Sequence, residues 1–284
     1  MDSDQASPPP AQSSSAVRVA TLPRALDHLE AILAQFEGRQ PMIFLDFDGT
    51  LSPIVDHPED AAIDPATREA VRRLAERYPI AILSGRDRED VERRVGLESL
   101  VYAGSHGFDV RGPDGLRYEH EEAVDYLPEL DALEEELRAA VAGIDGALVD
   151  RKRFAVAVHD RQVADALRPR VREAVLETGQ RHPRLHTSKG RRVHEFQPDV
   201  PWDKGRALLW LIDALGYDRS GVAAIYVGDD TTDEDAFVAL RETEAGVGVV
   251  VRSEDRETGA QYRLDGTEEV LDLLVRLRAR LAAT

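Results

Sequence analysis

The sequence predicts an α/β protein with a Rossmann-like parallel-sheet core and a smaller α/β unit inserted into it. Short apolar runs alternate with amphipathic helical segments in two stretches, residues 21–112 and 199–284. Between them, over residues 113–198, the rhythm changes to helix, two strands, helix, two strands. With 284 residues, the chain is long enough to form two such units. We therefore expect a core built from both outer stretches and an inserted cap domain over residues 113–198.

The N-terminal stretch and the first half of the core are justified by local patterns. Residues 1–20 are rich in Pro, Ser and Gln, which predicts a disordered tail. Asp64-Pro65 is a helix start, because Asp caps a helix and Pro fits its first turn. A hairpin is expected near residues 110–116. The remaining elements follow from apolar spacing: helices at 26–36, about 65–74 and 87–95, and strands at 42–45, 80–83 and 101–103.

The insert and the second half of the core follow the same logic. In the insert, Pro169 either kinks a helix or delays its start, and Lys189-Gly190 is expected as the turn of a hairpin. The insert elements are helices at 130–141 and 163–176 and strands at 147–149, 154–158, about 185 and 193–196. The final core elements are helices at 204–215, 233–240 and 268–280 and strands at 223–227 and 246–251.

Composition excludes several classes of function. The chain has no Cys, so it has no disulfide, thiolate nucleophile or Cys-based zinc site. Its 36 Lys and Arg against 54 Asp and Glu give a net charge of −18, which disfavours nucleic acid and anionic membranes as partners. The acidic N-terminus is unlike a signal peptide, and no apolar run is long enough to span a membrane. We therefore expect a cytoplasmic protein.

Polar clusters follow three of the predicted core strands. They are Asp46-Phe-Asp48-Gly-Thr50, Ser84-Gly-Arg86 and Gly228-Asp-Asp-Thr-Thr-Asp-Glu-Asp235. The carboxyl ends of parallel strands meet at one edge of a sheet, which is where such folds bind ligands. Carboxylates this close repel each other unless a cation neutralises them, and oxygen ligands without Cys favour Mg²⁺. A cation, hydroxyl groups and a lysine together are suited to handling a phosphoryl group.

The same acidic residues also have a structural interpretation. Asp233 could cap a helix rather than serve the site, and both roles stay open. Asp235 is better explained as a charge at a helix start. By contrast, Asp46 and Asp48 follow an apolar strand directly and precede Gly-Thr, which favours a role in chemistry.

These motifs resemble those of the haloacid-dehalogenase-like phosphatases. Ile43-Phe-Leu-Asp-Phe-Asp-Gly-Thr-Leu51 resembles their first motif, Ser84 the second, Lys204 the third and Gly228-Asp-Asp230 the fourth. Within that superfamily the chain is similar to the trehalose-6-phosphate phosphatases. The segments that carry this finer resemblance are 48–54, 83–86, 103–107, 152 with 156–159, 202–205 and 228–235.

The resemblance implies a route through a phospho-aspartate. Asp46 is then the nucleophile and Asp48 the general acid and base. Mg²⁺ is held by the Asp46 carboxylate, the Asp48 carbonyl and Asp229, and Asp230 and Asp233 orient its surroundings. The phosphate is bound by a set of small or cationic groups, namely Gly49, Thr50, Ser84 and Lys204.

The cap is expected to recognise the sugar. Lys152 and Glu195 match sugar contacts of the family, and His106 with Gly107 faces the cap from a core strand end. Arg86 either contacts substrate or braces its loop. The chain departs from the family pattern at Asp109, Asp160 and Gln197, near the sugar-contacting part.

The implied activity is Mg²⁺-dependent hydrolysis of trehalose 6-phosphate, with a possible functional link to a trehalose-phosphate synthase. The departures keep another sugar phosphate, such as a sucrose or mannosylglycerate phosphate, as an alternative substrate. A non-catalytic sugar-phosphate sensor expects a lost nucleophile, whereas Asp46 and Asp48 are both present. A phosphotransferase or mutase is chemically possible as well.

Overall fold

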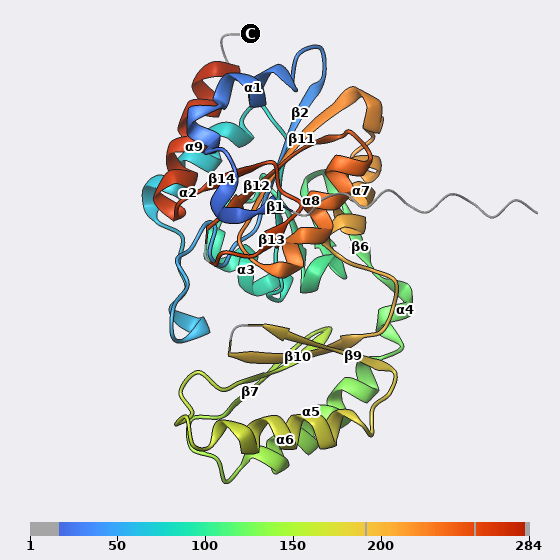
Figure 1. Cartoon of the computed structure of the whole chain (residues 1–284). Coiled ribbons are helices and arrows are strands. Elements are labelled where there is room, and N and C mark those ends of the chain that lie inside the picture. The colour runs from blue at the N-terminus through green and yellow to red at the C-terminus, as the bar shows by residue number, and fades with distance from the viewer. Residues whose placement is uncertain (1–16, 191, 253, 282–284) are drawn as a thin grey trace, which may run out of the picture.

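A mixed eight-stranded sheet forms the centre of the larger part of the molecule (Figure 1). The computed structural model describes residues 17–190, 192–252 and 254–281. The strand order is β14-β12-β11-β2-β3-β4-β5-β6, parallel from β14 to β4 and antiparallel from there. The predicted α/β fold class is therefore confirmed. The strands are β2 (Gln40–Leu45), β3 (Ile80–Leu83), β4 (Val101–Gly104), β5 (Asp109–Arg111), β6 (Arg117–Glu119), β11 (Val222–Gly228), β12 (Gly246–Val251) and β14 (Tyr262–Leu264).

Helices cover both faces of this sheet, which explains why its central strands are apolar throughout. On β2, Ile43 and Leu45 pack into the cluster under one helical layer, and Met42 and Phe44 pack into the cluster under the other. The first layer contains α1 (Leu29–Ala34), α2 (Pro65–Ala75), α3 (Arg88–Val95) and α9 (Thr267–Leu281). The second layer contains α7 (Lys204–Ala214) and α8 (Glu234–Glu242).

A separate four-stranded antiparallel sheet, in the order β7-β8-β10-β9, faces the core across a gap between the ribbons (Figure 1). One face of this sheet packs on two helices, with Val156, Val158 and Phe196 in their shared apolar cluster. Because side chains alternate along a strand, Lys152 and Glu195 belong to the opposite face, toward the core. The elements are α4 (Glu121–Val124), α5 (Leu127–Val141), β7 (Leu148–Lys152), β8 (Ala155–His159), α6 (Arg168–Gly179), β9 (Leu185–Gly190) and β10 (Val193–Pro198).

Three expectations besides the N-terminal tail need correction. Lys189 and Gly190 are not the turn of the hairpin: both lie on β9 and pair with β10. The hairpin expected at 110–116 forms as β5 and β6, but both strands extend the large sheet, so that sheet continues to Glu119, past the expected boundary at residue 112. The helix expected at 163–176 begins only at Arg168. Pro169 has no N–H to donate, so it fits the first turn of a helix and not its middle. Residues 163–167 accordingly form no helix, and residues 165–167 are a turn.

The tail expected over residues 1–20 is wrong at its C-terminal end, while residues 1–16 lie outside the described part. Val17 and Arg18 form β1 (Val17–Arg18), which pairs with β13 (Glu257–Thr258). Val19 is fully buried against the sheet. This strand could not be predicted from the sequence, because a two-residue strand gives no hydrophobic periodicity.

The 3-10 helices of the described residues are η1 (Val19–Thr21), η2 (Ala25–Asp27), η3 (Pro58–Asp60), η4 (Ser105–Gly107), η5 (Pro113–Gly115), η6 (Arg219–Gly221) and η7 (Thr231–Asp233).

Helix length bears on the expectation about membranes. The helices α5 and α9 contain 15 residues each and carry charged side chains. Over the described ranges, none of the helices has both the length and the apolar character needed to cross a bilayer.

Anchoring of the N-terminal segment by Val19 can be tested with a matched pair of variants. Val19→Asp buries a carboxylate in an apolar cluster, so we expect it to lower the free energy of unfolding by roughly 3 kcal/mol or more. Ala20→Asp adds the same group at the exposed neighbouring position, and we expect a change within about 0.5 kcal/mol. Urea denaturation of both variants provides the measurement. Equal effects would show that Val19 is not anchored in the core.

Candidate active site

The first and fourth sequence motifs meet because their strands are neighbours. β2 and β11 are parallel, with Leu45 opposite Val227, and the Asp46 amide donates to the Val227 carbonyl at 2.9 Å. Both strands end at the same edge of the sheet, so Asp46 and Asp229 emerge side by side. The register of this one strand pair therefore sets the distance between the predicted nucleophile and the predicted metal ligand.

Three buried carboxylates form the centre of the site. Asp46, Asp229 and Asp233 are 5%, 6% and 0% exposed, and each offers an oxygen such that all three lie within 4.8 Å of one another. Carboxylates at this separation repel strongly in a desolvated pocket. The three residues are referred to below as the acidic cluster. The Asp48 side chain lies outside this cluster, although the sequence grouped it with Asp46 and Asp229.

Lys204 supplies the positive charge that faces the acidic cluster. It begins α7, and its ammonium group donates to Asp46 at 2.8 Å and to Asp233 at 2.6 Å. Burial alone lowers the pKa of Lys204, but the charges of Asp233 and Asp46 outweigh this and hold that pKa well above its usual value. Lys204 therefore stays protonated and joins Asp46 to Asp233 of the fourth motif.

The pKa values of Asp46 and Asp229 show that Lys204 balances only part of the negative charge in the acidic cluster. Burial raises the pKa of Asp46 to about 8, an effect that Asp233 and Asp48 increase and Lys204 opposes. Burial, together with the charges of Asp46, Asp233 and Asp230, raises the pKa of Asp229 to about 9. One ammonium group does not balance three carboxylates, so without further positive charge this site retains protons at neutral pH.

Asp233 combines the two roles that the sequence left open. Its Oδ2 accepts from the Asp230 amide at 2.9 Å, in a reciprocal capping arrangement with the Asp230 side chain. Its Oδ1 accepts from Lys204 and from the hydroxyl of Tyr226, which lies at 2.6 Å and is fully buried. The sequence analysis did not identify Tyr226 as a functional residue. The available signal was its hydroxyl group on an otherwise apolar strand. Asp230 itself is exposed.

Gly49 lies directly against Asp229. It has φ +76°, and a Cβ there would lie 2.2 Å from the Asp229 carboxylate, so only glycine fits. The sequence assigned its amide to phosphate, but in the structure that amide donates to the Ser52 carbonyl at 2.7 Å. The tight turn uses this donor internally.

Thr50 is fully buried beside this turn. Its hydroxyl oxygen has no hydrogen-bond partner among the described residues. A buried hydroxyl without a partner is costly and is typical of a group that a ligand or water completes.

Arg86 braces Asp48. Its guanidinium group donates to both Asp48 oxygens, at 2.7 and 2.8 Å, and also contacts Asp90 and the Pro58 carbonyl. A bidentate pair of this kind fixes the orientation of a carboxylate. The Ser84 hydroxyl, which is also buried, accepts from the Arg86 amide at 3.1 Å. Of the two roles considered for Arg86, this geometry favours bracing.

A second cluster of polar side chains joins the cap to the core. Lys152 on β7 donates to Glu195 on β10 at 3.1 Å, and His106 of the core lies 3.8 Å from the same Glu195 oxygen. Burial raises the pKa of Glu195, but Lys152 and His106 outweigh it, so this pKa lies below its ordinary range. The His106 ring packs on Gly85, where a Cβ would lie 2.8 Å from it. We call Lys152, Glu195 and His106 the cap triad.

Gly107, a predicted substrate residue, and Asp109, a departure from the family pattern, both have structural contacts. Gly107 has φ +97°, and a Cβ there would lie 2.3 Å from Ala207 on α7, so packing explains this glycine. Asp109 accepts from the buried Arg88 at 3.0 Å.

Arg256 is a further contact that the sequence did not reveal. It donates to the Asp230 carbonyl at 2.8 Å and to the Asp229 carbonyl at 3.2 Å, and so supports the fourth motif.

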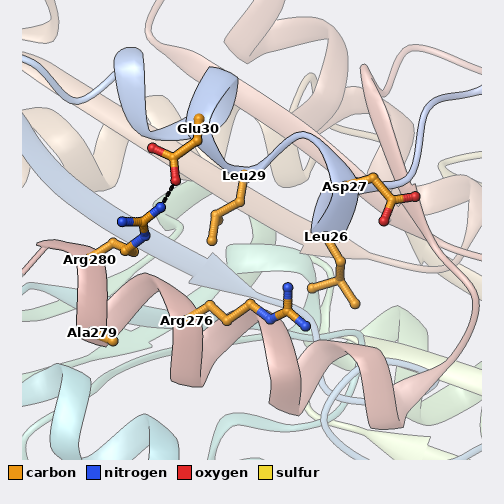
Figure 2. Close-up of a pocket in the computed structure, with 7 residues that line it drawn as sticks. All are labelled: Leu26, Asp27, Leu29, Glu30, Arg276, Ala279 and Arg280. Carbon is orange, nitrogen blue, oxygen red and sulfur yellow. Dashed lines mark hydrogen bonds and ion pairs between the residues drawn. The ribbon is translucent and has the colours of Figure 1, made fainter.

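A groove with a volume of about 390 Å³ lies elsewhere, between α1 and α9 (Figure 2). Leu26 and Leu29 line it together with Arg276 and Arg280, the last of which pairs with Glu30. None of its lining residues belongs to the acidic cluster, the cap triad or the motifs that flank them. Its cations are matched by neighbouring acids, so it offers no concentrated charge for a ligand.

Comparisons with known proteins identify the family of this chain. Residues 44–268 match the family model described as trehalose-phosphatase. The chain is 42% identical to a probable trehalose-phosphate phosphatase E of Arabidopsis thaliana over 90% of this chain and 75% of the relative. It is 44% identical to a trehalose-phosphate phosphatase of Mycobacterium tuberculosis over 93% of this chain and 68% of the relative.

Solved structures give the same assignment at the level of the fold. A trehalose-6-phosphate phosphatase related protein, 26% identical, superposes with a TM-score of 0.74 over 85% of this chain and 99% of that structure. The C-terminal domain of a Candida albicans trehalose-6-phosphate phosphatase, 21% identical, superposes with a TM-score of 0.77 over 94% and 99%. The fold is thus that of the haloacid-dehalogenase-like hydrolases. The chain is a phosphoric monoester hydrolase and belongs to the trehalose-phosphatase family.

Proposed function

We propose that this protein hydrolyses trehalose 6-phosphate to trehalose and phosphate, with Mg²⁺ bound at the acidic cluster and a phospho-aspartate on Asp46. The observation that carries the proposal is the buried arrangement of Asp46, Asp229, Asp233 and Lys204. The names of the relatives, at 42% and 44% identity, supply the substrate.

The donor set of the acidic cluster suits a divalent magnesium ion. Asp46 and Asp229 offer carboxylate oxygens, and their pKa values, raised to about 8 and about 9, show a shortage of positive charge. Mg²⁺ accepts one or two carboxylates and completes its shell with waters and phosphate oxygens. Asp46 and Asp229, with the Asp48 carbonyl, hold the ion, while Asp230 and Asp233 orient its surroundings. When bound, the ion supplies charge that keeps both carboxylates ionised and neutralises the phosphoryl group.

The protein residues divide the reaction into two displacements. Asp46 attacks phosphorus, the bond between phosphorus and the sugar oxygen breaks, and Asp48, which must be protonated for this step, gives that oxygen its proton. Asp48 then takes a proton from the water that releases phosphate from Asp46. Arg86 orients Asp48 through its two hydrogen bonds. Lys204 neutralises charge on Asp46 and on the phosphoryl group, and Thr50 and Ser84 donate to its oxygens.

The cap triad is the sugar-binding part of the proposal. Lys152 and Glu195 lie on the sheet face directed at the core, where paired polar groups can bind the hydroxyl groups of a neutral sugar. Asp160 and Gln197 leave another sugar phosphate as the alternative substrate. A cytoplasmic location and a functional link to a trehalose-phosphate synthase stay predictions of the sequence. The division into a core and a cap domain, with a boundary after Glu119, is likewise our proposal.

Turnover of a panel of phosphosugars tests the substrate. With Mg²⁺ present, we expect trehalose 6-phosphate to have the highest kcat/KM, ahead of sucrose and mannosylglycerate phosphates, in a phosphate-release assay. Asp46→Asn keeps the shape but removes the nucleophile, so we expect turnover to fall at least about a thousandfold. Comparable kcat/KM values across the panel would favour the alternative substrates. Full turnover by Asp46→Asn would refute the phospho-aspartate.

The pH dependence of stability tests the cation site without using activity. The pKa of Asp229 is raised above its unfolded value, so its contribution to stability is present at low pH and is lost as pH rises toward about 9. In chelator, we expect the Tm to fall between pH 6 and pH 9, and the Tm increase caused by Mg²⁺ to grow over the same range.

Asp229→Asn is the control for this measurement. It removes the titrating carboxylate, so both trends should weaken. A Tm that responds to Mg²⁺ equally in the variant and the wild type would place the ion elsewhere.

The role of Lys152 in sugar recognition can be tested by comparing two substrates, one with the sugar and one without it. Lys152→Ala leaves Glu195 buried without its main partner, so we expect KM for trehalose 6-phosphate to rise about 10- to 100-fold. Turnover of a small aryl phosphate, which lacks the sugar, should change little. Arg138→Ala is the control, since Arg138 lies on α5 and pairs with Glu134 on the same helix. An equal loss on both substrates would remove Lys152 from sugar recognition.

A further inference from the structure

The carboxylate of Asp87 does not bond the amides at the start of α3, which are its expected partners. Asp87 occupies the N-cap position of α3, yet its side chain makes no capping hydrogen bond. The equivalent residues of two other helices do cap: Asp64 accepts from Ala66 at 2.8 Å and Asp203 accepts from Arg206 at 2.8 Å. An Asp at an N-cap ordinarily bonds the first free amides of its own helix. The Asp87 carboxylate therefore does not cap its own helix and is available for a contact elsewhere.

That other interaction crosses from the core to the cap. Oδ1 of Asp87 accepts the backbone N–H of Arg153 at 2.7 Å and the hydroxyl of Ser105 at 3.3 Å. Arg153 lies in the turn between β7 and β8, and its own side chain is held by Glu119 at 2.6 Å. Burial raises the pKa of Asp87, and the hydrogen bond from Arg153 opposes this. A charge-assisted hydrogen bond to a partly buried carboxylate is among the stronger polar contacts.

Both partners of Asp87 are sequence neighbours of the cap triad. Arg153 follows Lys152, and Ser105 precedes His106. Ser105 and His106 both have positive φ, +48° and +59°, a conformation that needs support from surrounding contacts. One carboxylate thus contacts the chain beside the cap cation and beside the core imidazole, which meet at Glu195.

We propose that Asp87 is a positioning residue that anchors the β7–β8 turn to the core and thereby sets the place of Lys152 relative to His106 and Glu195. It does not touch the acidic cluster in this proposal and takes no part in proton or phosphoryl transfer. Its role in sugar binding rests on the proposed function, whereas the anchor itself does not.

Hydrogen exchange tests the anchor without any substrate. In the free full-length protein, we expect Asp87→Ala to speed exchange of the amides at 152–154 at least about tenfold, because the Arg153 amide loses its acceptor. Glu89→Ala is the matched control: it removes a carboxylate from the same helix at a side chain that is 82% exposed. Asp87→Asn keeps an acceptor oxygen and should show a smaller increase. Unchanged exchange in Asp87→Ala would overturn the anchor, whatever the substrate is.

Kinetics test the positioning role. We expect Asp87→Ala to raise KM for trehalose 6-phosphate about tenfold, with Asp87→Asn intermediate, Glu89→Ala unchanged and turnover of a small aryl phosphate preserved. In the Asp87→Ala background, Lys152→Ala should raise KM less than it does in the wild type, since the two act through one arrangement.

Three results would separate the possible failures. Faster exchange with unchanged KM would refute positioning while leaving the anchor intact. Fully additive effects of Asp87→Ala and Lys152→Ala would also refute it. If another phosphosugar is the better substrate, the proposed function fails, and the same KM comparison on that phosphosugar decides positioning.

Discussion

Repulsion among three buried carboxylates is the constraint on which the rest of this structure depends. Asp46, Asp229 and Asp233 lie together at the edge of the sheet with one ammonium group, that of Lys204, against them. The arrangement holds a net negative charge in a desolvated place, which is unfavourable unless protons or a cation compensate. A buried net negative charge of this kind is typical of a site that binds a divalent cation. The same deficit of positive charge suits a pocket that binds a phosphate ester only together with its metal.

The fold holds this cluster by means that lie outside the motifs. Adjacent parallel strands β2 and β11 bring two acidic loops together, and Tyr226 and Arg256 support the second loop through Asp233 and through two backbone carbonyls. Arg86 fixes the orientation of Asp48, whereas Lys204 contacts Asp46. The proposed nucleophile and the proposed acid are therefore held by different cations. Separate partners allow two neighbouring carboxylates to serve different steps.

Much of the fold and the centre of the site could be predicted because strand ends are visible in the sequence. Apolar runs that change abruptly to Asp or Ser located Asp46, Ser84 and Asp229, and the parallel topology brought them to one edge. Contacts that depend on side-chain direction could not be predicted. Nothing local in the sequence shows that the Gly49 amide is used by Ser52, or that Asp87 faces the cap and not its own helix. Short pairings such as β1 with β13 carry no periodic signal.

The most direct test of the central claim is a crystal structure of the protein with Mn²⁺ in place of Mg²⁺, located by its anomalous scattering. The account predicts an ion bound between the carboxylates of Asp46 and Asp229, at about 2.0–2.3 Å from their oxygens. It also predicts that Lys204 keeps its contact with Asp233. An ion found only at other carboxylates, with the acidic cluster still free of metal at saturating Mn²⁺, would contradict it.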